Sequence, residues 1–506
     1  MTRFNRWISL KQPDKQRALG LETAAEYRAR WISIRVLYFT GFVMFLAFGI
    51  VATGVWPYLK SLDPGANKVF LAYVFAVPPV GQMFFSPFFG WWTNKLTSVR
   101  APLILLVGVF IVGNILYSLT DEFERHRRYI LLVARGLVGV GTSAVTICRA
   151  YISAATRVSE RTKTISYMSL AQSIGLMIGP TFQSVFSALG EQGFSVFGWF
   201  RINMYSSAGW VCVILGVFNM VLLMPYIFRD SPIAVKEAMK SQGAANAKET
   251  WKSMQLQYFA ITQTIVSFSL LMLLYVAFQA LLSPIALDQF GWTNEESLFY
   301  LGILMTVGAL ISCVLFLLLD PLCKRFGESN VLVYGAMFAL FLSQLMLIPF
   351  GSEPITSVTE VGNLTELHNS TTVASGCPLT QEWCQRIPPI SKVQFTISYT
   401  LLCVSFSIGT TLSQAVFSKL LGPRPQGTWM ALLTCAGSAA RILGPGSVTL
   451  YVLFGTYWTF GAGSVLAGLV FIWMWVYRNT LQPAKPVVPP EMAEELKVLN
   501  SKNIVQ

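Results

Sequence analysis

Long apolar segments dominate the hydrophobic pattern of the chain, and shorter polar segments separate them. Each apolar segment has about 20 residues, which is enough for a helix to cross a hydrocarbon core of about 30 Å. The segments lie at 33–58, 69–92, 101–119, 129–151, 166–188, 205–227, 258–283, 297–319, 330–350, 393–418, 428–453 and 457–477. The pattern therefore predicts an all-α membrane protein with twelve transmembrane helices.

The polar segments divide these helices into two groups of six. The stretch at 228–257, which contains SQGAANAKET, separates the two groups. We therefore expect two six-helix halves that are joined by a cytosolic central loop and flanked by cytosolic tails. The predicted boundaries are an N-terminal tail at 1–32, a half at 33–227, the central loop at 228–257, a half at 258–477 with a luminal loop at 351–392, and a C-terminal tail at 478–506.

Composition agrees with a membrane protein and excludes other classes. Charged residues are 12% and hydrophobic residues 54% of the 506 residues, whereas an ordinary soluble domain has about 25% charged residues. These values exclude a water-soluble enzyme. The net charge of +13 does not indicate nucleic-acid binding, because the topology explains it. With both termini cytosolic, the cytosolic segments contain about three times as many Lys and Arg residues as the opposite loops, as the positive-inside rule requires.

The loop at 351–392 independently supports this orientation. It contains two N-glycosylation sequons, at Asn363 and Asn369, and glycans are added only outside the cytosol. It also contains Cys377 and Cys384 in the string CPLTQEWC. An oxidising compartment allows a disulfide to persist. We therefore predict glycans on both asparagines and a Cys377–Cys384 disulfide on the luminal or extracellular side.

Matching motifs in the two groups of helices indicate an internal repeat. The fifth segment contains Gly175, Gly179 and Pro180, and the eleventh contains Gly444 and Pro445 at the corresponding place. Parallel six-helix repeats are a transporter architecture in which the substrate route lies between the halves. Small residues allow helices to approach closely, and Gly-Pro pairs kink them. We therefore expect these residues to shape the route rather than to bind cargo.

Short basic turns follow the second helix of each half. The first contains Gly90, Asn94 and Lys95, and the second contains Lys324 and Arg325. We expect these residues to latch helix ends together at the cytosolic face.

Three strings in the N-terminal half of the sequence resemble motifs of the major facilitator superfamily. They are Gly90 to Arg100 after helix 2, Arg135-Gly-x-x-Gly139-x-Gly141 in helix 4, and Gly175-x-x-x-Gly179-Pro180 in helix 5. Longer strings resemble a lysosomal branch of that superfamily, namely WISIRVLY, VWPYLK, LVARGLVGVG, IGLMIGP, SKLLGPRPQG and ARILGP. The resemblance implies a transporter fold, an endolysosomal membrane and the chloride conductance attributed to that branch.

The chain departs from this branch at three places. Asn94 and Lys95 stand where the helix 2 motif normally has Asp and Arg. Gln279 stands where the branch has Glu in helix 7, so the resemblance does not carry proton coupling over to this chain. The N-terminal tail lacks the acidic Leu-Leu sorting signal of the branch, which leaves the plasma membrane as the alternative location.

Arginines are the candidate site residues, because the predicted helices contain no Asp, Glu, Lys or His. An unpaired arginine in mid-membrane costs at least about 2.5–3.5 kcal/mol. We therefore expect Arg441 and Arg135 to face a water-filled cavity and to attract an anion, unless backbone carbonyls satisfy them. Arg149 and Arg35 lie near cytosolic ends, where snorkelling to the headgroups is the favoured interpretation. Arg149 and Gln279 complete the candidate pathway.

These residues favour transport over catalysis. The sequence has no paired carboxylates, no metal-spaced His or Cys and no phosphate-cradling loop, so we expect no cofactor and no enzyme activity. A transporter or channel-like path for small anions is the leading hypothesis. An exchanger of organic solutes or phosphate-type anions is the second, and a receptor or scaffold that transports nothing is the third. The expected partners are a small solute and the lipid bilayer, with a monomer favoured.

Overall fold

The computed structural model describes most of both predicted halves. The described residues are 20–66, 68–96, 98–190, 192–196, 200–242, 246, 256–351, 377 and 381–483. Asn363 and Asn369 lie outside these residues, so the glycosylation sites stay a prediction.

Six membrane-crossing segments form the N-terminal half. They are α3 (Ala24–Leu62), α4 (Lys68–Leu96), α5 (Arg100–Ser118), the pair α6 (Arg127–Gly141) and α7 (Ala144–Ala155), α8 (Val158–Phe186) and α9 (Ser206–Leu222). The fourth predicted helix is thus broken at Thr142 and Ser143. A short 3-10 turn, η1 (Thr120–Glu122), follows α5, and η2 (Ser187–Leu189) follows α8.

The C-terminal half repeats this order. Its segments are α12 (Tyr258–Asp288), α13 (Asn294–Phe326), the run α14 (Glu328–Asn330), η3 (Val331–Phe338) and α15 (Ala339–Met346), α16 (Lys392–Leu421), α17 (Gly427–Leu443) and α18 (Ser447–Val476). The 3-10 turns are η5 (Glu382–Gln385), η6 (Gly444–Gly446) and η7 (Arg478–Thr480). Gly455 inside α18 has a φ of 75°, a left-handed conformation that glycine adopts readily. The eleventh crossing therefore ends there and the twelfth begins.

Length and composition alone identify nine candidate spans among the described residues. One of these, Gly427–Val476, includes the turn at Gly455 and so contains two crossings. The short apolar helix α9 and the long, more polar helix α8 supply the remaining two. The arrangement agrees with the predicted all-α membrane fold of twelve helices.

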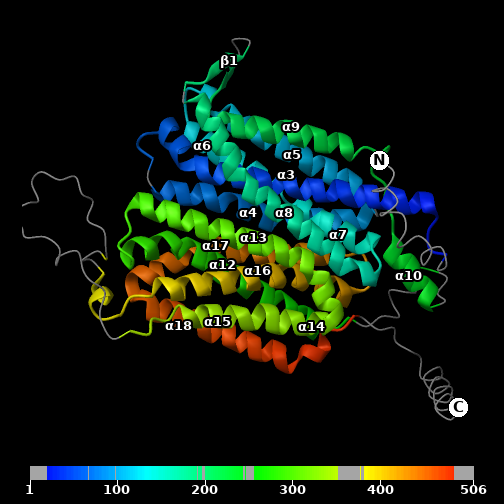
Figure 1. The fold of residues 1–506 in the computed structure, drawn as a ribbon. Helices are drawn as coiled ribbons and strands as arrows, with labels where there is room; N and C mark the ends of the chain where they lie inside the picture. The colour runs from blue at the N-terminus through cyan, green and yellow to red at the C-terminus, as the bar shows by residue number, and fades with distance from the viewer. Residues whose placement is uncertain are drawn as a thin grey trace, which may run out of the picture.

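The two halves lie side by side in Figure 1, with the N-terminal half above the C-terminal half. Helix α3 begins and α18 finishes at the same end of the bundle, which we call the terminal end. It also carries the short helix α10 (Ile233–Gln242) from the central loop. The opposite end carries the antiparallel hairpin of β1 (Phe194–Val196) and β2 (Phe200–Ile202), and we call it the hairpin end. Neither α10 nor the hairpin was predicted from the sequence.

Each half has its own hydrophobic core. Apart from Ala415, the buried cluster of the N-terminal half draws only on residues of that half, and apart from Ala150 the same holds for the C-terminal half. Such cores let each half move as a unit relative to the other.

Motif glycines hold the N-terminal core together at helix crossings. A Cβ added at Gly179 would lie 2.4 Å from the carbonyl carbon of Gly49, and one at Gly139 would lie 2.3 Å from the carbonyl oxygen of Pro78. A Cβ added at Gly175 or Gly141 would likewise lie 2.5 or 2.8 Å from the backbone of a neighbouring helix. These positions admit no larger residue without separating the helices, which is the packing role expected of them.

The disulfide between Cys377 and Cys384 is present in the structure. It belongs to the segment that includes η5 and covers the C-terminal half at the hairpin end. There the Trp383 indole donates a hydrogen bond to the Val452 carbonyl at 3.2 Å, and its ring packs against the turn at Gly455.

Candidate functional site

Arg441 lies in the middle of the membrane-crossing part of the bundle. It is 14 residues from Gly427, where α17 begins, and 14 from the turn at Gly455. Its Nη2 donates one hydrogen bond to the Gln82 Oε1 on α4, in the opposite half, and another to the Ser438 Oγ at 3.0 Å. The side chain therefore contacts both halves and bonds only neutral acceptors.

Arg149 approaches the same region from the N-terminal half. It lies on α7 and is half-buried, and its Nη2 donates to the Gln172 Oε1 on α8 at 3.5 Å. The snorkelling interpretation does not describe this side chain, because its Nε atom is fully buried inside the bundle.

The helices that carry Arg149 and Arg441 are in contact, because the Thr146 Oγ1 of α7 donates to the Thr434 Oγ1 of α17 at 3.0 Å, and Arg441 contributes to the electrostatic environment of Arg149. These two like charges come from opposite halves and face a shared interior. Among the described residues, no carboxylate pairs with either guanidinium. Two uncompensated cations in a low-dielectric interior are costly unless an anion joins them. The pair therefore forms a candidate anion site between the halves.

Arg135 lies elsewhere. It is 2% exposed on α6 and lies near Tyr117 of α5 and Cys212 of α9. Val138, one turn further along α6, packs against Gly113 of α5. This face of α6 is buried within the N-terminal half, so the structure does not place Arg135 with Arg441 in a shared cavity. The position of Arg135 depends on which face of α6 carries it, and the sequence motif does not reveal that face.

Gln279 lies on α12 in the C-terminal half. Its Nε2 donates to the Tyr275 Oη at 2.9 Å, and the Tyr275 ring stacks on Phe406 of α16 with centroids 3.7 Å apart. These half-buried groups form a polar and aromatic wall on the two helices. Helix α12 lies beside the arginine-bearing helix, because a Cβ on Gly444 would lie 2.7 Å from Val276. Pro445 follows within η6, the 3-10 turn that interrupts the eleventh crossing.

Helices α4 and α17 close the bundle at the terminal end. A Cβ on Gly90 would lie 2.5 Å from the Gly427 carbonyl oxygen, so the two backbones touch. The Asn94 Oδ1 accepts a hydrogen bond from the Gly427 N–H at 2.9 Å, and its Nδ2 donates to the Thr428 Oγ1 at 2.9 Å. Asn94 thereby caps the N-terminus of α17 from the opposite half.

The basic residues of the two turns do not join the halves in this structure. Lys95 lies over the Trp91 ring at 5.3 Å, and Lys324 pairs with Asp320 of its own helix at 2.5 Å. Arg325 lies over the Phe326 ring.

A different polar network joins the halves at the terminal end. Lys419 of α16 donates to the Thr162 Oγ1 at 2.9 Å and to the Glu328 Oε1 at 2.5 Å. The fully buried Arg161 donates to the Ser418 carbonyl at 3.1 Å. These contacts between the halves, like those of Asn94, all lie at the terminal end. The structure is therefore a conformation closed at the terminal end.

Asn94 provides a test of this closure. A cap of this kind contributes about 0.5–2 kcal/mol, so Asn94→Ala is expected to raise the population open at the terminal end about 2- to 30-fold. Asn94→Asp should raise the closed population, because a carboxylate is favoured at a helix N-terminus by about 0.3–1 kcal/mol. Distances between spin labels at exposed positions 95 and 325 report both populations. Identical distance distributions in the three proteins would show that Asn94 does not control closure.

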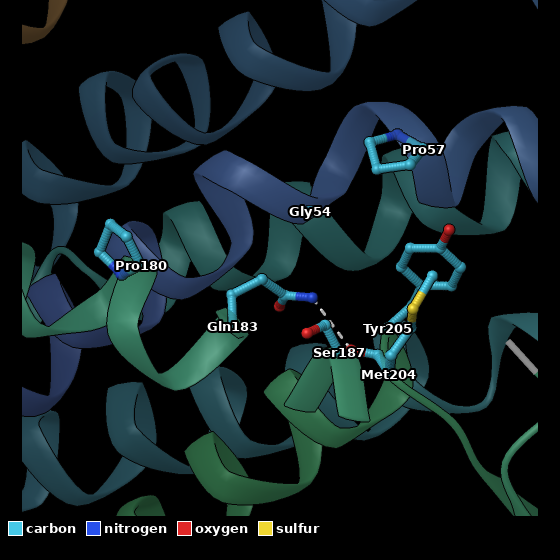
Figure 2. Close-up of a pocket in the computed structure, with 7 residues that line it drawn as sticks. All are labelled: Gly54, Pro57, Pro180, Gln183, Ser187, Met204 and Tyr205. Atoms are coloured by element: carbon cyan, nitrogen blue, oxygen red, sulfur yellow. Dashed lines mark hydrogen bonds between the residues drawn. The ribbon is translucent and has the colours of Figure 1, made fainter. Parts of the chain in front are cut away.

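A separate cavity of about 340 Å³ lies in the N-terminal half. Gly54, Pro57, Pro180, Gln183, Ser187, Met204 and Tyr205 line it. Figure 2 shows these side chains between α3 and α8, with the Gln183 amide directed at Met204. Its Nε2 donates to the Met204 carbonyl at 3.0 Å. The cavity includes Pro180 but none of the intramembrane arginines, so it is distinct from the candidate anion site.

Sequence reasoning missed three residues that contact the arginines. Gln82 and Gln172 are 6% and 5% exposed, and Ser438 is fully buried. Each is an uncharged polar residue inside a predicted span. Such residues in an apolar segment signal a polar interior, but only the folded arrangement shows that they surround two arginines.

The fold and the site together define a multi-pass membrane protein with two helical halves and a polar interior between them. This is the architecture of a solute transporter. A model of the Major Facilitator Superfamily matches residues 37–363, and the chain belongs to that family of membrane transporters.

Two curated relatives illustrate this membership. The chain is 34% identical over 461 residues to the Major facilitator superfamily domain-containing protein 8 of Xenopus laevis, which covers 87% of this chain and 90% of that protein. It is 24% identical over 313 residues to the Multidrug resistance protein 2 of Bacillus subtilis (strain 168), which covers 60% of this chain and 71% of that protein.

Solved structures support the same fold. The proton:xylose symporter XylE superimposes with a TM-score of 0.65 at 12% identity, over 93% of this chain and 99% of that chain. The human organic anion transporter MFSD10 gives a TM-score of 0.58 at 15% identity, over 88% and 99% of the two chains.

Proposed function

We propose that this protein transports small anions across an endolysosomal membrane, and that Arg149 and Arg441 form the binding site. The observation that carries the proposal is the pairing of two arginines from opposite halves without a neighbouring carboxylate. Fixed positive charge in a membrane route selects for anions.

The position of the site suits alternating access. Because Arg149 and Arg441 belong to different halves, an anion held between them would contact both halves. Movement of the halves about the site would expose the anion first at one end of the bundle and then at the other. Chloride is the candidate ion that the family resemblance implies.

An exchanger of organic solutes is the second candidate. It is favoured by the wall of Gln279, Tyr275 and Phe406 beside the arginine-bearing helix. Stacked aromatic rings and an amide suit an organic molecule better than a lone ion.

Flux measurements on the purified full chain in proteoliposomes separate these candidates. The anion proposal predicts uptake of labelled chloride, phosphate, sulfate or benzoate that rises with the opposing anion gradient. Exchange of neutral sugars or zwitterionic amino acids without anion flux would support the second candidate. Tight specific binding of solutes without flux of any kind would indicate a receptor.

An endolysosomal membrane is proposed from the resemblance to the lysosomal branch, with the plasma membrane as the alternative. Antibody staining of the untagged chain beside a lysosomal marker distinguishes the two. Staining confined to the cell surface would overturn the endolysosomal proposal and leave the transport proposal intact.

A further inference from the structure

Three buried hydrogen-bond donors of the arginine site have no acceptor among the described residues. They are the Nε atoms of Arg149 and Arg441 and the Nε2 atom of Gln172. Buried donors without acceptors are rare, because each loses its hydrogen bonds to water without replacement. The Nε atoms of other buried arginines, such as Arg135 and Arg161, also lack acceptors. Those of Arg149 and Arg441 differ in lying with the Gln172 amide between the two halves, where an acceptor-rich ligand can bind.

The bonds already present show which faces of these groups are available. Arg441 uses Nη2 for both of its partners, and Arg149 uses Nη2 for its single long bond to Gln172. Gln172 accepts that bond through Oε1, which orients its NH₂ group away from Arg149. Each guanidinium thus keeps its Nε N–H unbonded and has no negatively charged partner.

This donor set matches an oxyanion better than chloride. A guanidinium is a planar fork whose N–H groups bind two oxygens of one carboxylate, phosphate or sulfate in parallel. The Nη2 group of Arg441 is already bonded to Gln82 and Ser438, so this arginine offers its Nε N–H rather than a complete fork. The Nε N–H groups of the two arginines and the Gln172 amide, on three different helices, would bind separate oxygens of one ligand, whereas chloride offers a single centre. The three unbonded groups all donate, so the atoms that they bind on a ligand must be acceptors.

We propose that the transported anion is an oxyanion, free or as the carboxylate or phosphate group of a small organic molecule, and that Gln172 helps to select it. This inference rests on the proposed anion transport and names its substrate class. Gln172 orients Arg149 through Oε1 and binds a ligand oxygen through Nε2. Gln172 was not among the candidate site residues predicted from the sequence.

Competition binding on the full chain in nanodiscs tests this selection. Sodium phosphate, sulfate and benzoate are expected to raise the Tm and to compete with one another, while sodium chloride at equal ionic strength has at least tenfold weaker effect. Gln172→Glu should weaken oxyanion binding at least tenfold, because its carboxylate would pair with Arg149 and repel the ligand. Gln172→Met keeps the volume without the charge, and should weaken binding about fivefold, the value of one hydrogen bond of about 1 kcal/mol.

Gln183→Glu is the matched control, because it makes the same change on the same helix at the separate cavity of Figure 2. It should leave oxyanion binding unchanged.

Transport and binding of chloride with no response to any oxyanion would overturn the inference and leave anion transport standing. Absence of binding and flux for every anion would overturn the proposed function itself. Among the oxyanions, a response to benzoate alone would identify an organic acid, and a response to phosphate or sulfate would identify a free inorganic ion. Oxyanion binding that is equal in the Gln172→Met variant and the unmodified protein would remove Gln172 from the site.

Discussion

Replacing Arg441 by alanine is expected to lower anion flux about 10- to 100-fold while the protein still folds. The change removes the positive charge at the centre of the membrane and the hydrogen bonds of its guanidinium to Gln82 and Ser438. A hydrogen bond from the charged guanidinium to the bound anion would contribute about 1.5–3 kcal/mol, which corresponds to that range of affinity. Uptake of labelled anion into proteoliposomes, normalised to inserted protein, measures the loss.

Two further variants make this result interpretable. Arg441→Lys should restore flux only in part, because it keeps the charge but loses the planar fork. Arg35→Ala is the control, since Arg35 is an intramembrane arginine of α3 that is exposed on the bundle surface. If Arg441→Ala instead lowers the Tm and the surviving protein transports normally, Arg441 is a structural residue that bonds neighbouring groups.

The predicted membrane helices agree with the structure because their signal is strong and local. Runs of about 20 apolar residues must cross the membrane as helices, since lipid offers no partners for the backbone. The expected packing role of Gly175 and Gly179 also agrees, because only small residues let helices approach so closely. The break between α6 and α7, by contrast, leaves no trace in hydropathy, since Thr142 and Ser143 lie in an otherwise apolar run.

The site itself could be predicted only in part. Sequence reasoning proposed Arg441 as a site residue from its depth, and the structure shows it bonded to Gln82 and Ser438 without a carboxylate partner. Sequence reasoning grouped Arg441 with Arg135, whereas in the structure the helix of Arg149 contacts the helix of Arg441. Depth along a helix follows from residue number, but the direction of a side chain depends on how helices from opposite halves pack. Gln82 and Gln172 were missed for the same reason.

Closure of the terminal end depends on a backbone contact that no side chain can replace. Gly90 and Gly427 approach each other so closely that a Cβ on either would lie within 2.5 Å of the other's carbonyl oxygen. Gly90→Val is therefore expected to prevent the closed conformation, because backbone cannot move aside as a flexible side chain can. Overpacking of this kind costs about 1–3 kcal/mol or more. Since each half keeps its own core, the protein should still fold.

The variant should be held open at the terminal end, and net transport should fall at least tenfold. Alternating access requires both ends to close in turn, and a protein that cannot close one end binds its substrate without carrying it across. Spin labels at positions 95 and 325 should move apart, while oxyanion binding measured by Tm persists. Gly302→Val is the matched control, because a Cβ at Gly302 of α13 meets no atom within 4 Å. Unchanged label distances together with normal flux in the Gly90→Val protein would show that α4 and α17 can close by another arrangement, and that their contact is not the gate.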